Sequence, residues 1–288
     1  MDGGCALDVV GGSGSTNLGS FLGKQRGHHP RDSIEPSTFA YPMAPVHASL
    51  SDLYRADGSA TFSQNGYNVI GAVNGPIEVL RRDELPEEAA IEVNVRPASG
   101  VGSPKERHLE NLIHSTLRQV ILVRNHPRTL IQVTLQVLQV PEGDASDDRS
   151  RSSNLSILPA LLEASILALV SASIPLNTTF SSAIVVITPE GQFVTSPSVK
   201  QLTSASSTHV LAFSARGDLL VSESEGAFDM GAWDRAHDTA KRACTAATAK
   251  SDGDMELDLP GDQQNLHTML KDEVSRKVQR EQAWKDAP

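Results

Sequence analysis

Aromatic residues and cysteine are scarce in this chain of 288 residues. Phe, Trp and Tyr together make up 4% of it, and the only two cysteines, Cys5 and Cys244, lie far apart. A disulfide framework is therefore not expected, and the cysteine usage indicates a reducing compartment. The hydrophobic content of 39% is nevertheless enough for a substantial buried core.

Long hydrophobic runs are also missing. The longest, Ile157–Val170, is interrupted by Pro159, Glu163 and Ser165, so no membrane-spanning segment and no membrane partner are expected. The first residues contain no basic region followed by an apolar core, so no secretory signal is expected either. Nuclear or cytoplasmic residence is the default prediction.

The chain also has no overall excess of positive charge. Lys and Arg number 25 against 35 Asp and Glu, which gives a formal net charge of −10. This balance argues against a strongly basic, free-standing nucleic-acid binder, but it leaves room for a local basic path.

Turn residues and β-branched residues alternate between residues 54 and 97. Asp57-Gly58 predicts a turn after Tyr54, since glycine readily adopts a positive φ. Gly75-Pro76 is expected to separate two strands, Val69–Val73 and Ile77–Leu80, and a further strand follows at Ile91–Val95. The pattern predicts an antiparallel meander that leads into a helix.

The helix is expected to begin at Ser103-Pro104, where Ser103 can cap, Pro104 fits the first helical position and Glu106 completes a capping box. Its apolar residues recur at helical spacing as far as Ile121. The elements expected after it are a strand at Thr129–Val140, a loop at Pro141–Asn154, a largely buried helix at Ser156–Ser173, strands at Ser182–Ile187, Thr208–Phe213 and Leu219–Glu223, and a helix at Asp229–Lys250.

One ordered series of residues carries a family resemblance. It runs through Asp57-Gly58-Ser59, Gly75-Pro76-Ile77-Glu78-Val79, Arg96-Pro97 and Lys105-Glu106-Arg107. In this order the segments resemble the RNase PH family of phosphorolytic 3′-exoribonucleases, and within it the ring subunits of the RNA exosome. The resemblance implies an α/β (α+β) RNase PH-like fold in which β-sheets pack on central helices.

The expected domain organisation has three parts. Residues 1–47 are rich in Gly, Ser, His and Pro and are predicted to be a disordered tail. The RNase PH-like domain is expected over residues 48–250, followed by a charged extension at 251–288. In that extension a thin apolar stripe is expected either to dock on a partner or to fray in solvent; it consists of Leu266, Met269, Leu270, Val274 and Val278.

The resemblance also shows which groups are missing. Active members of the family hold phosphate on a Gly-Gly-Thr/Ser-Arg turn at a helix N-terminus, where this chain has residues 152–156, Ser-Ser-Asn-Leu-Ser. They also place Asp carboxylates on and after a strand, where Phe193–Thr203 contains no acid. The chain is therefore expected to have no catalytic residues, no metal and no cofactor.

A basic path lies within the part that carries the resemblance. Between residues 96 and 128 six cations face two acids, Glu106 and Glu110, a local excess of +4; the cations are Arg96, Lys105, Arg107, Arg118, Arg124 and Arg128. By resemblance this region can face the channel that threads single-stranded RNA. Lys105 and Arg107 are the first candidates for phosphate contacts and Arg96 the next. The alternative is a solvated face whose cations pair with Glu106 and Glu110.

Three functions stay open at this point. The first is a non-catalytic subunit of the exosome core ring, in the nucleus (nucleolus) and cytoplasm, with other RNase PH-like subunits, cap subunits and single-stranded RNA as partners. The second is an active phosphorolytic 3′-exoribonuclease with a remodelled site. The third is a stand-alone RNA-binding homo-oligomer.

Overall fold

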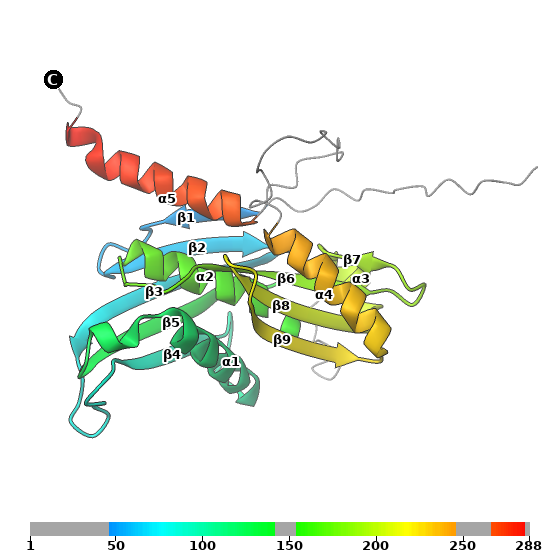
Figure 1. Ribbon diagram of the computed structural model, residues 1–288, viewed down its shortest axis with the longest axis horizontal. Coiled ribbons are helices and arrows are strands. Elements are labelled where there is room, and N and C mark those ends of the chain that lie inside the picture. Colours follow the sequence, from blue (N-terminus) through cyan, green and yellow to red (C-terminus); the bar gives the residue numbers. More distant parts are fainter. Residues whose placement is uncertain (1–45, 142–153, 246–265, 286–288) are drawn as a thin grey trace, which may run out of the picture. The chain divides into compact units, whose positions relative to one another are not determined.

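The first of two sheets contains five strands, in the order β1-β2-β3-β5-β4 (Figure 1). The computed structural model describes residues 46–141, 154–245 and 266–285. Neighbouring strands of this sheet are antiparallel except for β4 and β5, which are parallel. The strands are β1 His47–Leu50, β2 Gly58–Gln64, β3 Tyr67–Glu78, β4 Ala90–Arg96 and β5 Thr129–Gln139. His47, which the sequence placed in the tail, therefore begins the first strand.

The second sheet is fully antiparallel, with strand order β7-β6-β8-β9. Its strands are β6 Phe180–Ile187, β7 Phe193–Val194, β8 Ser207–Ser214 and β9 Leu219–Gly226. The interior position of β6 and the β8–β9 hairpin confirm the sequence prediction for this part. Every residue of β6 and of β8 is buried, as expected for strands covered on both faces.

Helix α2, Leu158–Ser171, is the centre of the core. It packs on β2 and β3 of the first sheet and on β6 of the second (Figure 1). All of its residues except Val170 are buried, which confirms the prediction of a helix buried on most sides. Helix α4, Met230–Thr245, covers β6 and β8 through the small side chains Ala236 and Ala240. The sheets packed on these central helices confirm the expected α/β (α+β) architecture.

The remaining helices are α1 Pro104–Val120, α3 Val199–Thr203 and α5 Leu266–Gln282, with 3₁₀ turns at Val123–Asn125, Asn154–Ser156 and Ala283–Lys285. The predicted capping box is present at α1: the Ser103 amide donates to the Glu106 carboxylate at 2.6 Å, and the Ser103 hydroxyl accepts from the Lys105 amide at 3.2 Å. In the part of the chain that is described, no helix combines the length and apolarity needed to cross a membrane.

The prediction of two strands separated at Gly75-Pro76 is wrong. β3 runs unbroken from Tyr67 to Glu78 and contains a cis peptide bond between Gly75 and Pro76. Its pairing with β5 shifts register between Asn74 and Ile77, which is a β-bulge. Proline has no N–H to donate to a ladder, and a bulge is a position where a strand tolerates it.

The reason given for Gly58 is also wrong. The glycines that have a positive φ do not include Gly58, which is the first residue of β2. A Cβ atom at this position would lie 2.2 Å from the amide nitrogen of Ala172 and 2.5 Å from the carbonyl oxygen of Ala168. Gly58 is therefore required by the close approach of β2 to the C-terminal turn of α2, and the preceding chain makes the turn.

Most described members of the C-terminal apolar stripe pack on the core of this same chain, whereas Val278 is 43% exposed. Met269 and Leu270 are buried in the core of this same chain, and Val274 packs against that core. Residues 1–45, 142–153 and 246–265 and the side chain of Leu266 lie outside the described residues. They include most of the expected tail at 1–47 and of the expected loop at Pro141–Asn154. The domain limits 48–250 and 251–288 stay predictions.

Candidate nucleic-acid interface

The end of β4 and the beginning of α1 bring Arg96 and Lys105 to one end of the first sheet. β4 ends at Arg96, the chain continues through residues 97–103, and α1 packs back along β4. Arg96 is exposed and Lys105 is half-buried in the first turn of α1. Partial burial acts to raise the pKa of Glu106, but hydrogen bonds from Ser103 and the charge of Lys105 outweigh it and hold that pKa below its usual value.

Arg107 forms an ion pair with Glu110 on the same helix. Its guanidinium lies 3.0 Å from Oε2 of Glu110, and the other oxygen of Glu110 accepts the amide of Val95 at 2.9 Å. The Arg107 side chain is nevertheless 79% exposed, against 11% for Glu110. The Arg107 end of this pair therefore faces solvent, where a phosphate could reach the guanidinium, while the Glu110 end is largely buried.

Two further cations of the basic path are paired with acids that the sequence count did not include. Arg118 lies 2.7 Å from Glu88, and Arg128 lies 3.3 Å from Glu84. Both acids precede β4, outside the window from 96 to 128. The fold therefore offsets part of the local excess of positive charge, and it does so farthest from the Arg96–Lys105 end.

The N-terminus of α2 is closed by apolar residues. Leu155 and Leu158 are buried, Ile157 at the cap position makes no side-chain hydrogen bond, and Pro159 occupies the first turn. An anion site at a helix N-terminus needs free backbone N–H groups, and proline removes one of them. Ser152 and Ser153 lie outside the described residues.

The acid-free segment after β6 forms the short strand β7 and the five-residue helix α3. Ser198 and Gln201 make a capping box at the start of α3, with the Ser198 amide donating to Gln201 Oε1 at 2.8 Å. Among residues 46–141, 154–245 and 266–285 there is no group of three or more His, Cys, Asp or Glu side chains that could hold a metal ion. The Ser198 and Gln201 side chains of this segment cap the N-terminus of α3.

Comparison with known proteins identifies the family to which the chain belongs. A family model described as "3' exoribonuclease family, domain 1" matches residues 43–175. The "Exosome complex component RRP46" of Saccharomyces cerevisiae is 36% identical over 168 residues, which cover 58% of this chain and 73% of that protein. The chain belongs to the RNase PH family. The Schizosaccharomyces pombe protein "Exosome complex component rrp46" is 41% identical over 114 residues, 40% of this chain and 49% of the relative.

The fold agrees with that membership. The crystal structure of rice (Oryza sativa) Rrp46 superposes with a TM-score of 0.63 at 24% sequence identity, covering 83% of this chain and 96% of the rice chain. The match confirms the RNase PH-like fold that the resemblance implied. It extends over nearly all of the rice chain.

One buried carboxyl group was not singled out as a site from the sequence. Glu163 of α2 is fully buried, and its Oε1 accepts the amide of Ser182 at 2.6 Å and the Ser182 hydroxyl at 3.0 Å. Its Oε2 has no hydrogen-bond partner among the described residues. Burial raises the pKa of Glu163 to about 8. Burial and then the nearby charge of Glu163 raise the pKa of the Cys244 thiol to about 12.

Glu163 is a core residue of this RNase PH-like domain. It points between α2 and β6, where Ser182 and Cys244 enclose it, and RNA has no access to it. The only trace of it in the sequence is an acid inside an otherwise apolar helix.

His209 on β8 is a second buried titratable group. Its two ring nitrogens lie 3.0 Å from the Ser207 hydroxyl and 2.8 Å from the Ser224 hydroxyl, and its ring meets Phe228 edge-on. Burial lowers the pKa of His209. Both ring nitrogens are within hydrogen-bonding distance of serine hydroxyls, so His209 and the two serines form a polar network between β8 and β9.

Proposed function

We propose that this chain is a non-catalytic structural subunit of an RNA exosome core ring, which supports 3′–5′ RNA processing and degradation and guides RNA through the central channel. The observation that carries the proposal is the 36% identity to an exosome complex component over 73% of that protein. The partners would be other RNase PH-like ring subunits, cap subunits and single-stranded RNA. The residence that follows is the nucleus, including the nucleolus, and the cytoplasm.

The lack of catalysis rests on two separate parts of the chain. Residues 152–156 supply neither the glycines nor the arginine of the family's phosphate turn, and apolar residues close the helix end behind them. Residues 193–203 supply no carboxylate for a metal or for proton transfer. Phosphorolysis requires both functions, and the loss of either would slow it severely.

RNA contact is assigned to Lys105, Arg107 and Arg96, at the end of the sheet where β4 meets α1. Arg96 and Arg107 are exposed, and the guanidinium of Arg107 forms an ion pair with the largely buried Glu110. Such residues read phosphates rather than bases. Together they give a path that favours RNA of any sequence.

The first test is native mass spectrometry on the tagged protein purified from its own cells. A complex of several different RNase PH-like chains is the expected result, and a monomer or homo-oligomer would overturn the proposal. Phosphate-dependent release of nucleoside diphosphates from RNA by the purified chain would instead establish the active phosphorolytic enzyme.

A further inference from the structure

Glu110 connects helix α1 to the end of strand β4 through the two oxygens of one carboxylate. Its Oε1 accepts the Val95 amide at 2.9 Å, and its Oε2 lies 3.0 Å from a terminal nitrogen of the Arg107 guanidinium. The Glu110 side chain is 11% exposed, whereas that of Arg107 is 79% exposed. A largely buried acid therefore binds the backbone of the sheet on one side and an exposed cation on the other.

The Val95 amide is available to Glu110 because β4 is an edge strand, with β5 as its one neighbour in the sheet. Such a strand presents N–H and C=O groups that no other strand pairs with. Glu110 supplies the acceptor for one of them, and both residues are buried where α1 packs on β4. The backbone of the sheet thus fixes the orientation of this carboxylate.

Arg107 retains donors for a second anion. A guanidinium carries five N–H groups, and Glu110 engages one terminal nitrogen of it. The exposed remainder can bind a phosphate, for which the planar fork of N–H groups is suited. An arginine that is already held in place loses less conformational freedom when the phosphate binds.

Within the proposed RNA path, on which this role depends, we propose that Glu110 is a positioning residue that holds the Arg107 guanidinium at the end of β4 for contact with an RNA phosphate. Glu110 itself does not touch RNA, because its side chain is largely buried. Its negative charge opposes phosphate binding. Its benefit therefore comes from orienting Arg107, and this benefit exceeds the cost of the charge.

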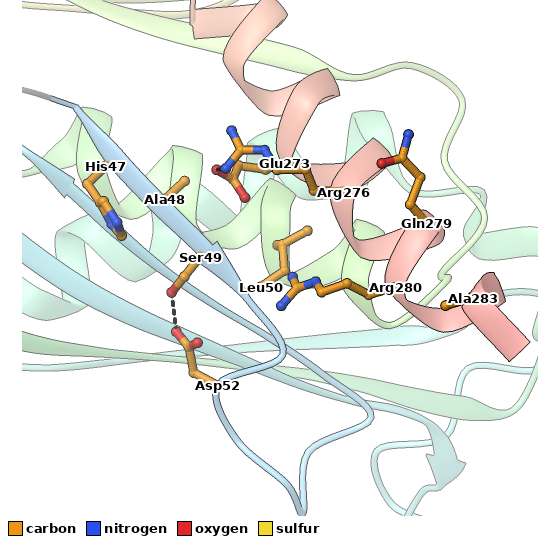
Figure 2. Close-up of a pocket in the computed structure, with 10 residues that line it drawn as sticks. All are labelled: His47, Ala48, Ser49, Leu50, Asp52, Glu273, Arg276, Gln279, Arg280 and Ala283. Carbon is orange, nitrogen blue, oxygen red and sulfur yellow. Dashed lines mark hydrogen bonds and ion pairs between the residues drawn. The ribbon is translucent and has the colours of Figure 1, made fainter. Parts of the chain in front are cut away.

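A second pair of the same kind provides a control. On α5, Glu273 lies 2.7 Å from Arg276, and the two side chains are 12% and 62% exposed. Figure 2 shows this pair beside β1, at the edge of the first sheet opposite β4. The spacing of three residues and the burial of the acid are similar, but the pair lies outside the proposed RNA path.

The test is the effect of Glu110→Leu on the affinity of the assembled ring for oligouridine, measured by fluorescence anisotropy. Removal of a negative charge would by itself strengthen binding, whereas loss of the oriented Arg107 weakens it. We expect a loss of at least about threefold, similar to that of Arg107→Gln. Glu273→Leu removes the same charge beside Arg276 and should leave the affinity within about twofold of the parent.

The double variant separates positioning from support of the fold. If Glu110 acts through Arg107, Glu110→Leu should cause no further loss once Arg107→Gln is present. If the leucine variant does not assemble, Glu110→Gln takes its place. Its single carbonyl oxygen cannot serve both the Val95 amide and Arg107 as two carboxylate oxygens do, so a smaller loss, again only in the presence of Arg107, is expected.

Two results would overturn the positioning role alone. Unchanged or stronger binding in Glu110→Leu would show that the acid merely neutralises Arg107, and a loss that persists beside Arg107→Gln would assign Glu110 to the support of β4. Unchanged affinity in Arg107→Gln itself would instead remove Arg107 from the RNA path, and the role of Glu110 with it.

Discussion

The Nζ atom of Lys277 donates to the carbonyl oxygen of Ser171 at 2.8 Å and to the Ser171 hydroxyl at 2.9 Å. Ser171 is the last residue of α2, whose final carbonyls have no partner within the helix. A cation at that end also interacts favourably with the helix dipole. Only 15% of the Lys277 side chain is exposed, so this contact fastens α5 to the centre of the core.

Replacing Lys277 with Met should loosen α5. The variant keeps the aliphatic part of the side chain but leaves the Ser171 carbonyl without its donor. We expect the free energy of unfolding to fall by about 1–3 kcal/mol, and amide exchange in α5 to become faster. Urea denaturation and hydrogen exchange measure the two effects. Lys271→Met, on the exposed side of α5, is the control, and equal losses in both variants would contradict the assignment.

The buried carboxyl of Glu163 makes stability depend on pH. With a pKa of about 8 in the folded protein against 4.5 for an ordinary Glu, the folded state retains a proton that the unfolded state releases between these values. The contribution of Glu163 to the free energy of unfolding is therefore complete below pH 4.5, falls as the pH rises toward 8 and stays constant above pH 8. Each pH unit in this window costs about 1.4 kcal/mol at most.

Glu163→Gln should remove this slope. Gln keeps the size of the side chain and an oxygen that can accept from Ser182, but it cannot ionise. We expect the variant to be more stable than the parent at pH 7.5, by a few kcal/mol, and nearly equal to it at pH 5. Denaturant titrations at both pH values provide the measurement. The lowered pKa of His209 acts in the opposite direction, below pH 6.5, and cancels in the comparison.

Local sequence patterns predicted the helices and strands that are determined by residues close together in the sequence. The start of α1 follows from the Ser103 capping box, and the burial of α2 follows from its apolar composition. The continuity of β3 through Gly75-Pro76 depends on its partner β5, which lies about sixty residues further along the chain. The place of α5 depends on contacts with β1 and Ser171, which no periodicity reveals.

The same distinction between local patterns and contacts of distant residues applies to the candidate site. Arg96 and Lys105 were predicted from the local charge count and the family resemblance, and their role in RNA contact stays a prediction. The pairing of Arg118 with Glu88 spans 30 residues, so a charge count in one window could not anticipate it. Glu163 was counted only as an interruption in an apolar run, because its hydrogen-bond partner Ser182 lies on strand β6, 19 residues further along the chain.

Gly58 tests the close packing of β2 on α2. In Gly58→Ala the new methyl group would overlap the backbone of Ala168 and Ala172, which cannot move aside as a flexible side chain would. We expect a loss of about 1–3 kcal/mol in the free energy of unfolding. Gly102→Ala is the matched control, because a Cβ there meets no atom within 4 Å. A stability close to that of the parent would show that strand and helix can separate without cost.

The RNA path is tested by reversing two charges, Lys105→Glu together with Arg107→Glu, in an assembled ring. The fold should persist, because the side chain of Arg107 is exposed and the hydrogen bond between Glu110 and the Val95 amide does not involve Arg107. RNA affinity should fall at least about tenfold, and the slope of its logarithm against that of salt concentration should decrease by about 2, one for each lost phosphate contact.

The matched control reverses two exposed cations elsewhere, Arg235→Glu with Arg242→Glu on α4. Both double variants change the net charge equally, so a general electrostatic effect on RNA would weaken binding in both. A loss confined to the Lys105/Arg107 variant would place the RNA at the end of the sheet where β4 meets α1. Arg96→Glu should then give a smaller loss of the same kind. Unchanged protection of RNA in the Lys105/Arg107 variant would remove the channel assignment, while leaving ring membership to be decided by mass spectrometry.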